Sequence, residues 1–194
     1  MLPWLIDTFE LPPPAWVIRH PCATIASQLR EGSWTGAGDY SESEYIQKYP
    51  EHEKIVKQAS TLEEKLACRW AIDHVLPISE GASGKCCVIS YEKMVAEFDE
   101  VLTRLAADWS VDATSVDLVK LRYSASVTTS NSGVAGIDGW TRRLSKDQIS
   151  QILGVVHAFG ITCYDSDPCP DRKAFESWLS RTQVSGSISG GCHT

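Results

Sequence analysis

Arg19 and Ser27 are the residues whose types and spacing point most directly to chemistry in this chain. Arg19 follows an apolar stretch, residues 15–18, that reads as a short strand. Pro21 then opens a helix at a position where a missing N–H group costs nothing, and the helix carries Ser27. A guanidinium group and the free N–H groups of a helix start both favour anions. The segment therefore predicts a phosphate site at the carboxyl end of a strand, where open α/β sheets hold their ligands. The alternative is an arginine in a surface salt bridge.

A second segment, residues 90–95, reads Ser-Tyr-Glu-Lys-Met-Val and follows an apolar stretch at 85–90 that predicts a buried strand. It opens a helix, so Tyr91 stands at the junction between the two elements. The alternative for Tyr91 is a tyrosine at the rim of the core with no ligand. Glu92 and the lysine after it are expected to form a solvated helix start, where the helix dipole favours the carboxylate.

A third segment, residues 130–144, is a loop rich in Ser, Asn and Gly that ends in Gly-Trp and two arginines. A capped helix follows, and it ends in Phe-Gly-Ile with a tyrosine three residues later, at 159–164. Arg142 or Arg143 could bring a positive charge to an anion. The alternative is that both arginines lie on the surface without a ligand.

In this order and spacing, the three segments resemble sulfotransferases that use 3′-phosphoadenosine-5′-phosphosulfate (PAPS). The first resembles the family's 3′-phosphate-binding segment, the second its adenine-binding tyrosine, and the third the loop that closes over the nucleotide. The resemblance implies that Arg19, Ser27 and Tyr91 bind PAPS or its product, adenosine 3′,5′-bisphosphate. It also implies an α/β fold, a P-loop-kinase-like parallel sheet flanked by helices. The implied activity is transfer of a sulfuryl group from PAPS to a hydroxyl or amine, without a metal.

The family also has a Pro-Lys/Arg-Ser-Gly-Thr-Thr-type loop near its N-terminus, which cradles the 5′-phosphosulfate. The residues before Trp16 include no glycine, lysine or arginine. We therefore expect a fold truncated at the N-terminus, with its activity in doubt, because charge stabilisation is most of the catalysis in such chemistry. The catalytic residues and the acceptor stay unassigned. Two hypotheses remain: a sulfotransferase, which another chain could complete, or a non-catalytic relic that binds a nucleotide or a protein partner.

His20 is the histidine beside the predicted phosphate site. Because Arg19 takes the phosphate role, His20 is expected to point away from it. The seven cysteines are an odd number and favour free thiols in a reducing compartment. A zinc site needs about four ligands, and no such spacing occurs, so no metal is expected. A disulfide between Cys163 and Cys169 is left open.

Net charge and hydropathy exclude several classes of protein. The net charge of −7 argues against non-specific binding of nucleic acid or of an anionic membrane. No apolar run approaches the ~20 residues of a membrane-spanning helix. Residues 1–14 lack the basic and apolar regions of a signal peptide, so a cytoplasmic location is expected.

The resemblance implies one partial sulfotransferase-like domain over residues 1–180, and the Ser/Gly composition of residues 185–194 predicts a disordered tail. A sheet without its first strand would expose Val17 and Val88, so a homodimer or an aggregating chain is expected. The alternative is that the first helix or the loop with Trp34 folds over the gap. Helices are expected at 2–9, from 21 to about 30, in one or two pieces within 41–59, from 62 to about 76 where Pro77 stops it, from 94 to about 109, and from 146 to about 159.

Overall fold

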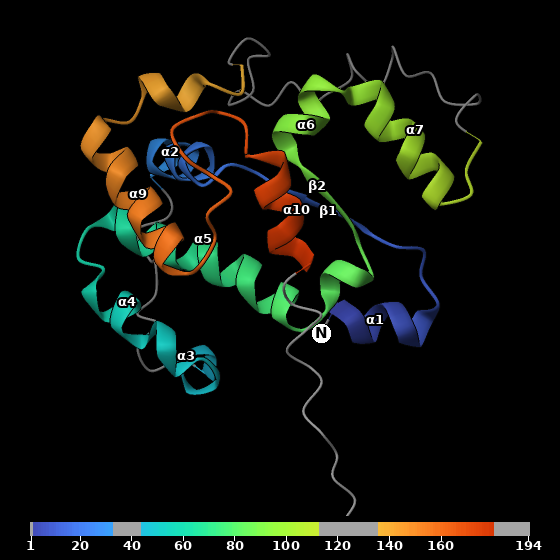
Figure 1. Cartoon of the computed structure of the whole chain (residues 1–194), viewed down its shortest axis with the longest axis horizontal. Coiled ribbons are helices and arrows are strands. Elements are labelled where there is room, and N and C mark those ends of the chain that lie inside the picture. The colour runs from blue at the N-terminus through green and yellow to red at the C-terminus, as the bar shows by residue number, and fades with distance from the viewer. Residues whose placement is uncertain (1, 33–43, 113–135, 181–194) are drawn as a thin grey trace, which may run out of the picture.

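The structure is a computed structural model that describes residues 2–32, 44–112 and 136–180. It is a mixed α/β structure, mostly helical, with a small parallel sheet of two strands (Figure 1). The first elements are α1 (Leu2–Phe9), β1 (Ala15–Ile18), α2 (Pro21–Glu31), α3 (Glu44–Lys48), η1 (Pro50–His52), α4 (Glu53–Gln58) and α5 (Leu62–Ser79). There follow η2 (Ala82–Gly84), β2 (Cys87–Ser90), α6 (Tyr91–Ala96), α7 (Phe98–Asp108), η4 (Gly139–Arg142), α9 (Lys146–Ala158) and α10 (Arg172–Ser180).

The two strands pair in a register that sorts their side chains onto two faces. Trp16 pairs with Val88 and Val17 with Ile89. Because side chains alternate along a strand, Trp16 and Val88 share one face and pack against the large core. Ile89 lies on the other face, in a small cluster with α7 residues, and α7 lies across the sheet from α2, α5 and α9 (Figure 1). Helices thus cover both faces of the sheet.

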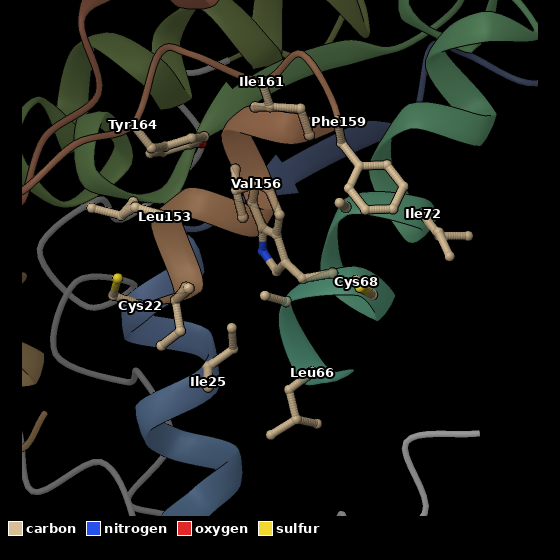
Figure 2. Packing of buried hydrophobic residues seen from close by; sticks show 14 of the residues in the cluster. Cys22, Ile25, Leu66, Cys68, Ile72, Leu153, Val156, Phe159, Ile161 and Tyr164 are labelled. Atoms are coloured by element: carbon tan, nitrogen blue, oxygen red, sulfur yellow. The ribbon is translucent and has the colours of Figure 1, made fainter. Parts of the chain in front are cut away.

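The large core forms where α2, α5 and α9 meet. Ile25 of α2, Leu66 of α5 and Val156 of α9 belong to this core (Figure 2), and none is more than 1% exposed. Ile161 and Tyr164, which follow α9, close the top of this cluster. This core holds β1 and the start of α2 in place, so it fixes the position of whatever follows β1.

Two helix starts are confirmed in atomic detail. At α5, the Glu64 N–H donates to Thr61 Oγ1 and the Thr61 N–H donates to Glu64 Oε2. At α9, Ser145 and Gln148 make the same reciprocal pair of bonds. Each pair satisfies two backbone donors that a helix start leaves without a partner, and it fixes where the helix begins.

Three predicted boundaries are wrong. Helix α5 continues past Pro77 to Ser79, because burial of Ile78, which is fully inaccessible, offsets the hydrogen bond that proline removes. Strand β2 begins at Cys87 rather than at residue 85. The helix predicted from residue 94 is two helices, because Glu97 has a non-helical backbone between α6 and α7.

Two predicted segments lie outside the described residues: most of the loop that precedes Gly139, and the Ser/Gly tail at 185–194. Among the described helices, none has the length and apolarity needed to cross a membrane. The finer expectation, a P-loop-kinase-like sheet, needs more strands than the two seen in this part of the chain.

Within the described residues, neither outer edge of the sheet has a strand partner. Val17 is 40% exposed on β1. We expect two copies to associate at the β1 edge of the sheet, because burial of apolar surface is worth ~25 cal/mol per Å². Light scattering should then give twice the 21.4 kDa mass of one chain. Val17→Lys should restore the monomer, whereas Val111→Lys, at another exposed valine, should not. A monodisperse wild-type monomer would contradict this expectation.

Candidate functional site

The carboxyl ends of both strands open on one pocket. Ile18 pairs with Ser90 at the last register position, so the next residues, Arg19 and Tyr91, emerge side by side. The guanidinium carbon of Arg19 lies 4.8 Å from the centre of the Tyr91 ring, a cation–π contact. This contact joins the residue after β1 to the first residue of α6.

Helix α2 supplies a second wall of the pocket. Ala23, Ser27 and Arg30 recur at the four- and three-residue spacing that places side chains on one face of a helix. That face lines a pocket of about 180 Å³. Its full lining is Arg19, Ala23, Ser27, Arg30, Glu31, Tyr91, Gly136, Ile137, Gly139, Trp140 and Arg143.

The pocket is rich in positive charge and hydrogen-bond donors. Three arginines and one glutamate, Glu31, line it, which gives a formal charge of +2 in a chain whose net charge is −7. Two of its N–H groups, Arg19 Nε and Trp140 Nε1, are buried and have no hydrogen-bond partner among the described residues. Buried donors normally have a partner, so both N–H groups can still donate a hydrogen bond. The pocket is therefore suited to an anion.

The three residues predicted as ligand-binding, Arg19, Ser27 and Tyr91, all lie in this pocket. Of the two candidate arginines after Trp140, Arg143 also lines it. Arg142 does not: its Nη1 lies 3.2 Å from Asp138 Oδ2 in an exposed ion pair.

His20 is not among the residues that line the pocket, in agreement with the expectation that it points away from the phosphate site. Its ring is fully buried and stacks on Trp140, with the ring centres 4.6 Å apart. His20 Nδ1 accepts the Cys22 N–H at 3.1 Å, so the proton is on Nε2, which donates to the Asp165 carbonyl oxygen at 3.1 Å. Burial lowers the pKa of His20 to about 4. His20 is thus a neutral cap for α2, with both nitrogens occupied.

Glu92 is also placed differently from the expectation of a solvated helix start. Its side chain is 1% exposed, and Glu92 Oε1 accepts the His20 backbone N–H at 2.9 Å. Burial raises the pKa of this carboxyl group. Glu92 therefore ties the start of α6 to the start of α2, behind the pocket wall.

Arg30 was not singled out from the sequence. The available signal was its position three residues after Ser27 on the same helix. Trp140 was noted as part of a motif, but its buried N–H donor became evident from the fold, because it depends on α2 packing against η4.

Few of the described residues that line the pocket could take up a proton near neutral pH. Glu31 is the one carboxylate and no histidine is present among the described residues that line it. In the described part of the chain, no cluster of three His, Cys, Asp or Glu side chains could hold a metal ion. Cys163 and Cys169, left open as a disulfide pair, are both free thiols.

The chain was compared with protein-family models, with curated proteins and with solved structures, and nothing matches in any of the three.

Proposed function

We propose that this pocket binds the 3′-phosphate of adenosine 3′,5′-bisphosphate or PAPS, in a sulfotransferase-like domain with a P-loop-kinase-like sheet. One observation carries the proposal. Arg19 and Ser27, from one sequence motif, and Tyr91, from a second motif far along the chain, line one cationic pocket. Chance placement on the surface would not bring the three together with two further arginines.

In this proposal each residue has a distinct role. Arg19 offers its Nε–H and the planar donors of its guanidinium group to the phosphate oxygens. Ser27 donates its hydroxyl from the facing turn of α2, and Arg143 adds charge from beyond η4. The Tyr91 ring, held by its contact with Arg19, offers a flat surface to the adenine. Acceptor-side residues stay unassigned.

The wider fold is compatible with this proposal. β1 and β2 are parallel, the connection between them contains helices, and helices cover both faces. Doubly covered parallel sheets hold ligands at the carboxyl ends of their strands. The pocket lies at that end of both strands.

Calorimetry should show that adenosine 3′,5′-bisphosphate binds more tightly than AMP, by about 10- to 100-fold. This is the range expected when a phosphate gains hydrogen bonds to a charged group. Arg19→Ala should remove most of the preference, and Arg143→Ala should reduce it. Equal affinities of the wild-type protein for the two nucleotides would contradict the assignment.

The adjacent arginine provides a matched control. Arg142→Ala removes the same charge one residue away, from a side chain already paired with Asp138. It should leave the preference unchanged. If Arg142→Ala and Arg143→Ala had the same effect, general electrostatic attraction would explain the binding, and the specific pocket would not.

The second hypothesis, nucleotide binding without catalysis, is favoured by one observation. His20, the histidine closest in sequence to the pocket residues, has both ring nitrogens hydrogen-bonded and is inaccessible. A general base must reach the proton that it removes. The described residues of the pocket therefore support binding better than they support transfer.

We expect the isolated chain to transfer sulfate from labelled PAPS to simple phenols more slowly than about 1 per second, an ordinary enzyme rate. The reason is that the described residues lining the pocket include no histidine and one carboxylate, Glu31. Turnover at or above this rate, abolished by Arg19→Ala, would show that the chain is a complete enzyme. A slow rate that Arg19→Ala does not change would indicate background reaction.

A further inference from the structure

A second pocket, of about 260 Å³, lies on the outer side of β2, where α6, α7 and α10 meet. Its lining combines apolar side chains with a ring of charges. The apolar part consists of Val88, Ile89, Ala96, Pro170, Phe175 and Leu179. This pocket shares no lining residue with the anion pocket.

The two residues that follow β2 line different pockets. Tyr91 lines the anion pocket, and Glu92 lines the second one. Glu92 is 1% exposed, and its Oε1 accepts the His20 N–H. Its other oxygen, Oε2, is buried and has no hydrogen-bond partner among the described residues. A buried carboxyl oxygen without a donor is costly, so Glu92 Oε2 is able to accept a further hydrogen bond.

Apart from Glu92, the charged residues that line this pocket sum to +1: four of them form two ion pairs, and the fifth, Arg104, is exposed. Lys93 Nζ lies 3.4 Å from Glu97 Oε2, and Arg172 Nε lies 3.1 Å from Glu176 Oε1. These ion pairs are at or near the protein surface, where each is worth little and leaves little net field. Neither ion pair includes Glu92, so Glu92 Oε2 remains without a hydrogen-bond donor among the described residues.

We propose that this second pocket binds a small molecule with an apolar body and a primary ammonium group. The ammonium would donate a hydrogen bond to Glu92 Oε2, and the apolar body would lie against Val88, Phe175 and Leu179. A carboxylate at the same position would be repelled. A neutral molecule without a donor would leave Oε2 unsatisfied. Small-molecule sites commonly have such a lining, mostly apolar with one placed polar group.

An ammonium ligand also fits the chemistry of a buried carboxyl group. Burial raises the pKa of Glu92, because the charged form loses its water. An opposite charge in contact with the group restores the ionised form. The Glu92 carboxylate and the ligand would then form a buried, hydrogen-bonded pair, which is the arrangement in which buried charges are tolerated.

Phenethylamine is a suitable probe, with phenethyl alcohol and hydrocinnamate as matched molecules that replace the ammonium by a hydroxyl and a carboxylate. Binding to the full chain is measured by calorimetry at about pH 8, where the alkylammonium group is still charged. For a molecule of this size we expect a Kd on the order of 1 mM. The amine should bind at least about 10-fold more tightly than hydrocinnamate.

Cys169 gives an independent readout of where the probe binds. It lines this pocket and is exposed as a free thiol. Saturating phenethylamine should slow its alkylation by iodoacetamide, followed by mass spectrometry of the peptide. Alkylation of Cys86, a half-buried thiol that does not line the pocket, should proceed at an unchanged rate.

Three variants test whether phenethylamine binds in this pocket and through Glu92. Glu92→Gln keeps an acceptor for the His20 N–H and removes the charge, so phenethylamine should bind about 10- to 100-fold more weakly. Ala96→Trp fills the pocket from an exposed position and should abolish binding. Val95→Trp, at the exposed neighbour that does not line the pocket, should leave binding unchanged.

Several outcomes would overturn the proposal. These are no binding of phenethylamine at tenfold above the expected Kd, equal binding of amine and carboxylate, or full binding by Ala96→Trp. Ala96→Trp decides the question even if Glu92→Gln does not fold. Adenosine 3′,5′-bisphosphate should bind Ala96→Trp as it binds the wild type, because Ala96 is not part of the anion pocket. Failure at the second pocket is therefore distinguishable from failure of the proposed nucleotide site.

Discussion

Trp140→Ala is expected to lower the free energy of unfolding by about 3–5 kcal/mol, the range for truncating a buried tryptophan. Trp140 is 3% exposed and stacks on the His20 ring at an interplanar angle of 16°. It is also the residue through which η4 packs into the large core. Its truncation would leave a cavity beside the N-cap of α2. The truncation should therefore disturb the packing of the pocket as well as that of the core.

Urea unfolding followed by circular dichroism measures this loss. Trp4→Ala is the matched control, because Trp4 is 61% exposed and its truncation should cost less than about 1 kcal/mol. Trp140→Phe separates two contributions: it keeps a buried aromatic ring and removes the Nε1 donor. It should retain most of the stability and bind adenosine 3′,5′-bisphosphate more weakly. A loss below about 1 kcal/mol for Trp140→Ala would show that the tryptophan does not join pocket and core.

The sequence predicted best where the signal was local. The end of β1 before Arg19 and the proline that opens α2 follow from neighbouring residues alone, as do both helix caps. The spacing of Ser27 along α2 is likewise local, so a motif could place Arg19 and Ser27 on one pocket. Tyr91 joined them because two parallel strands in register end together.

Prediction from the sequence failed where a contact joins segments that are far apart in the chain. Glu92 looked like a solvated helix start, because a charged residue at such a position usually is one. Its burial depends on the His20 N–H, 72 positions away in the sequence. The stacking of the His20 ring on Trp140 also joins distant segments, and nothing local to His20 predicts it. No periodicity or spacing encodes either contact.

Pro77 shows a second kind of error, which concerns the predicted end of a helix. Proline inside a helix removes one hydrogen bond and strains the preceding turn, which favours a helix end. The helix nevertheless continues for two residues, since Ile78 is fully buried in the core. Local propensity predicted the cost correctly, and tertiary packing decided the outcome.

His20 should make the protein sensitive to mild acid. Burial lowers its folded-state pKa to about 4, whereas an unfolded chain has a histidine pKa of about 6.5. Above about pH 6.5 the imidazole is neutral in both states, and its contribution to stability is fully present. Between about pH 6.5 and pH 4 the unfolded chain binds a proton that the folded chain does not. The free energy of unfolding should therefore fall by about 3 kcal/mol over this window, at about 1.36 kcal/mol per pH unit.

His20→Asn isolates this contribution, because asparagine can still cap α2 by accepting the Cys22 N–H but does not titrate. Other groups also titrate in this window. Glu92, with its raised pKa, acts in the opposite sense, since its contribution is lost as the pH rises. His74, with its lowered pKa, acts in the same sense as His20. Both groups are present in both proteins, so their contributions cancel in the comparison.

Urea unfolding between about pH 7 and pH 4 should show that the wild type loses about 3 kcal/mol more than His20→Asn. Parallel pH profiles would mean that His20 is accessible to protons in the folded state, and its imidazole would then be a candidate general base.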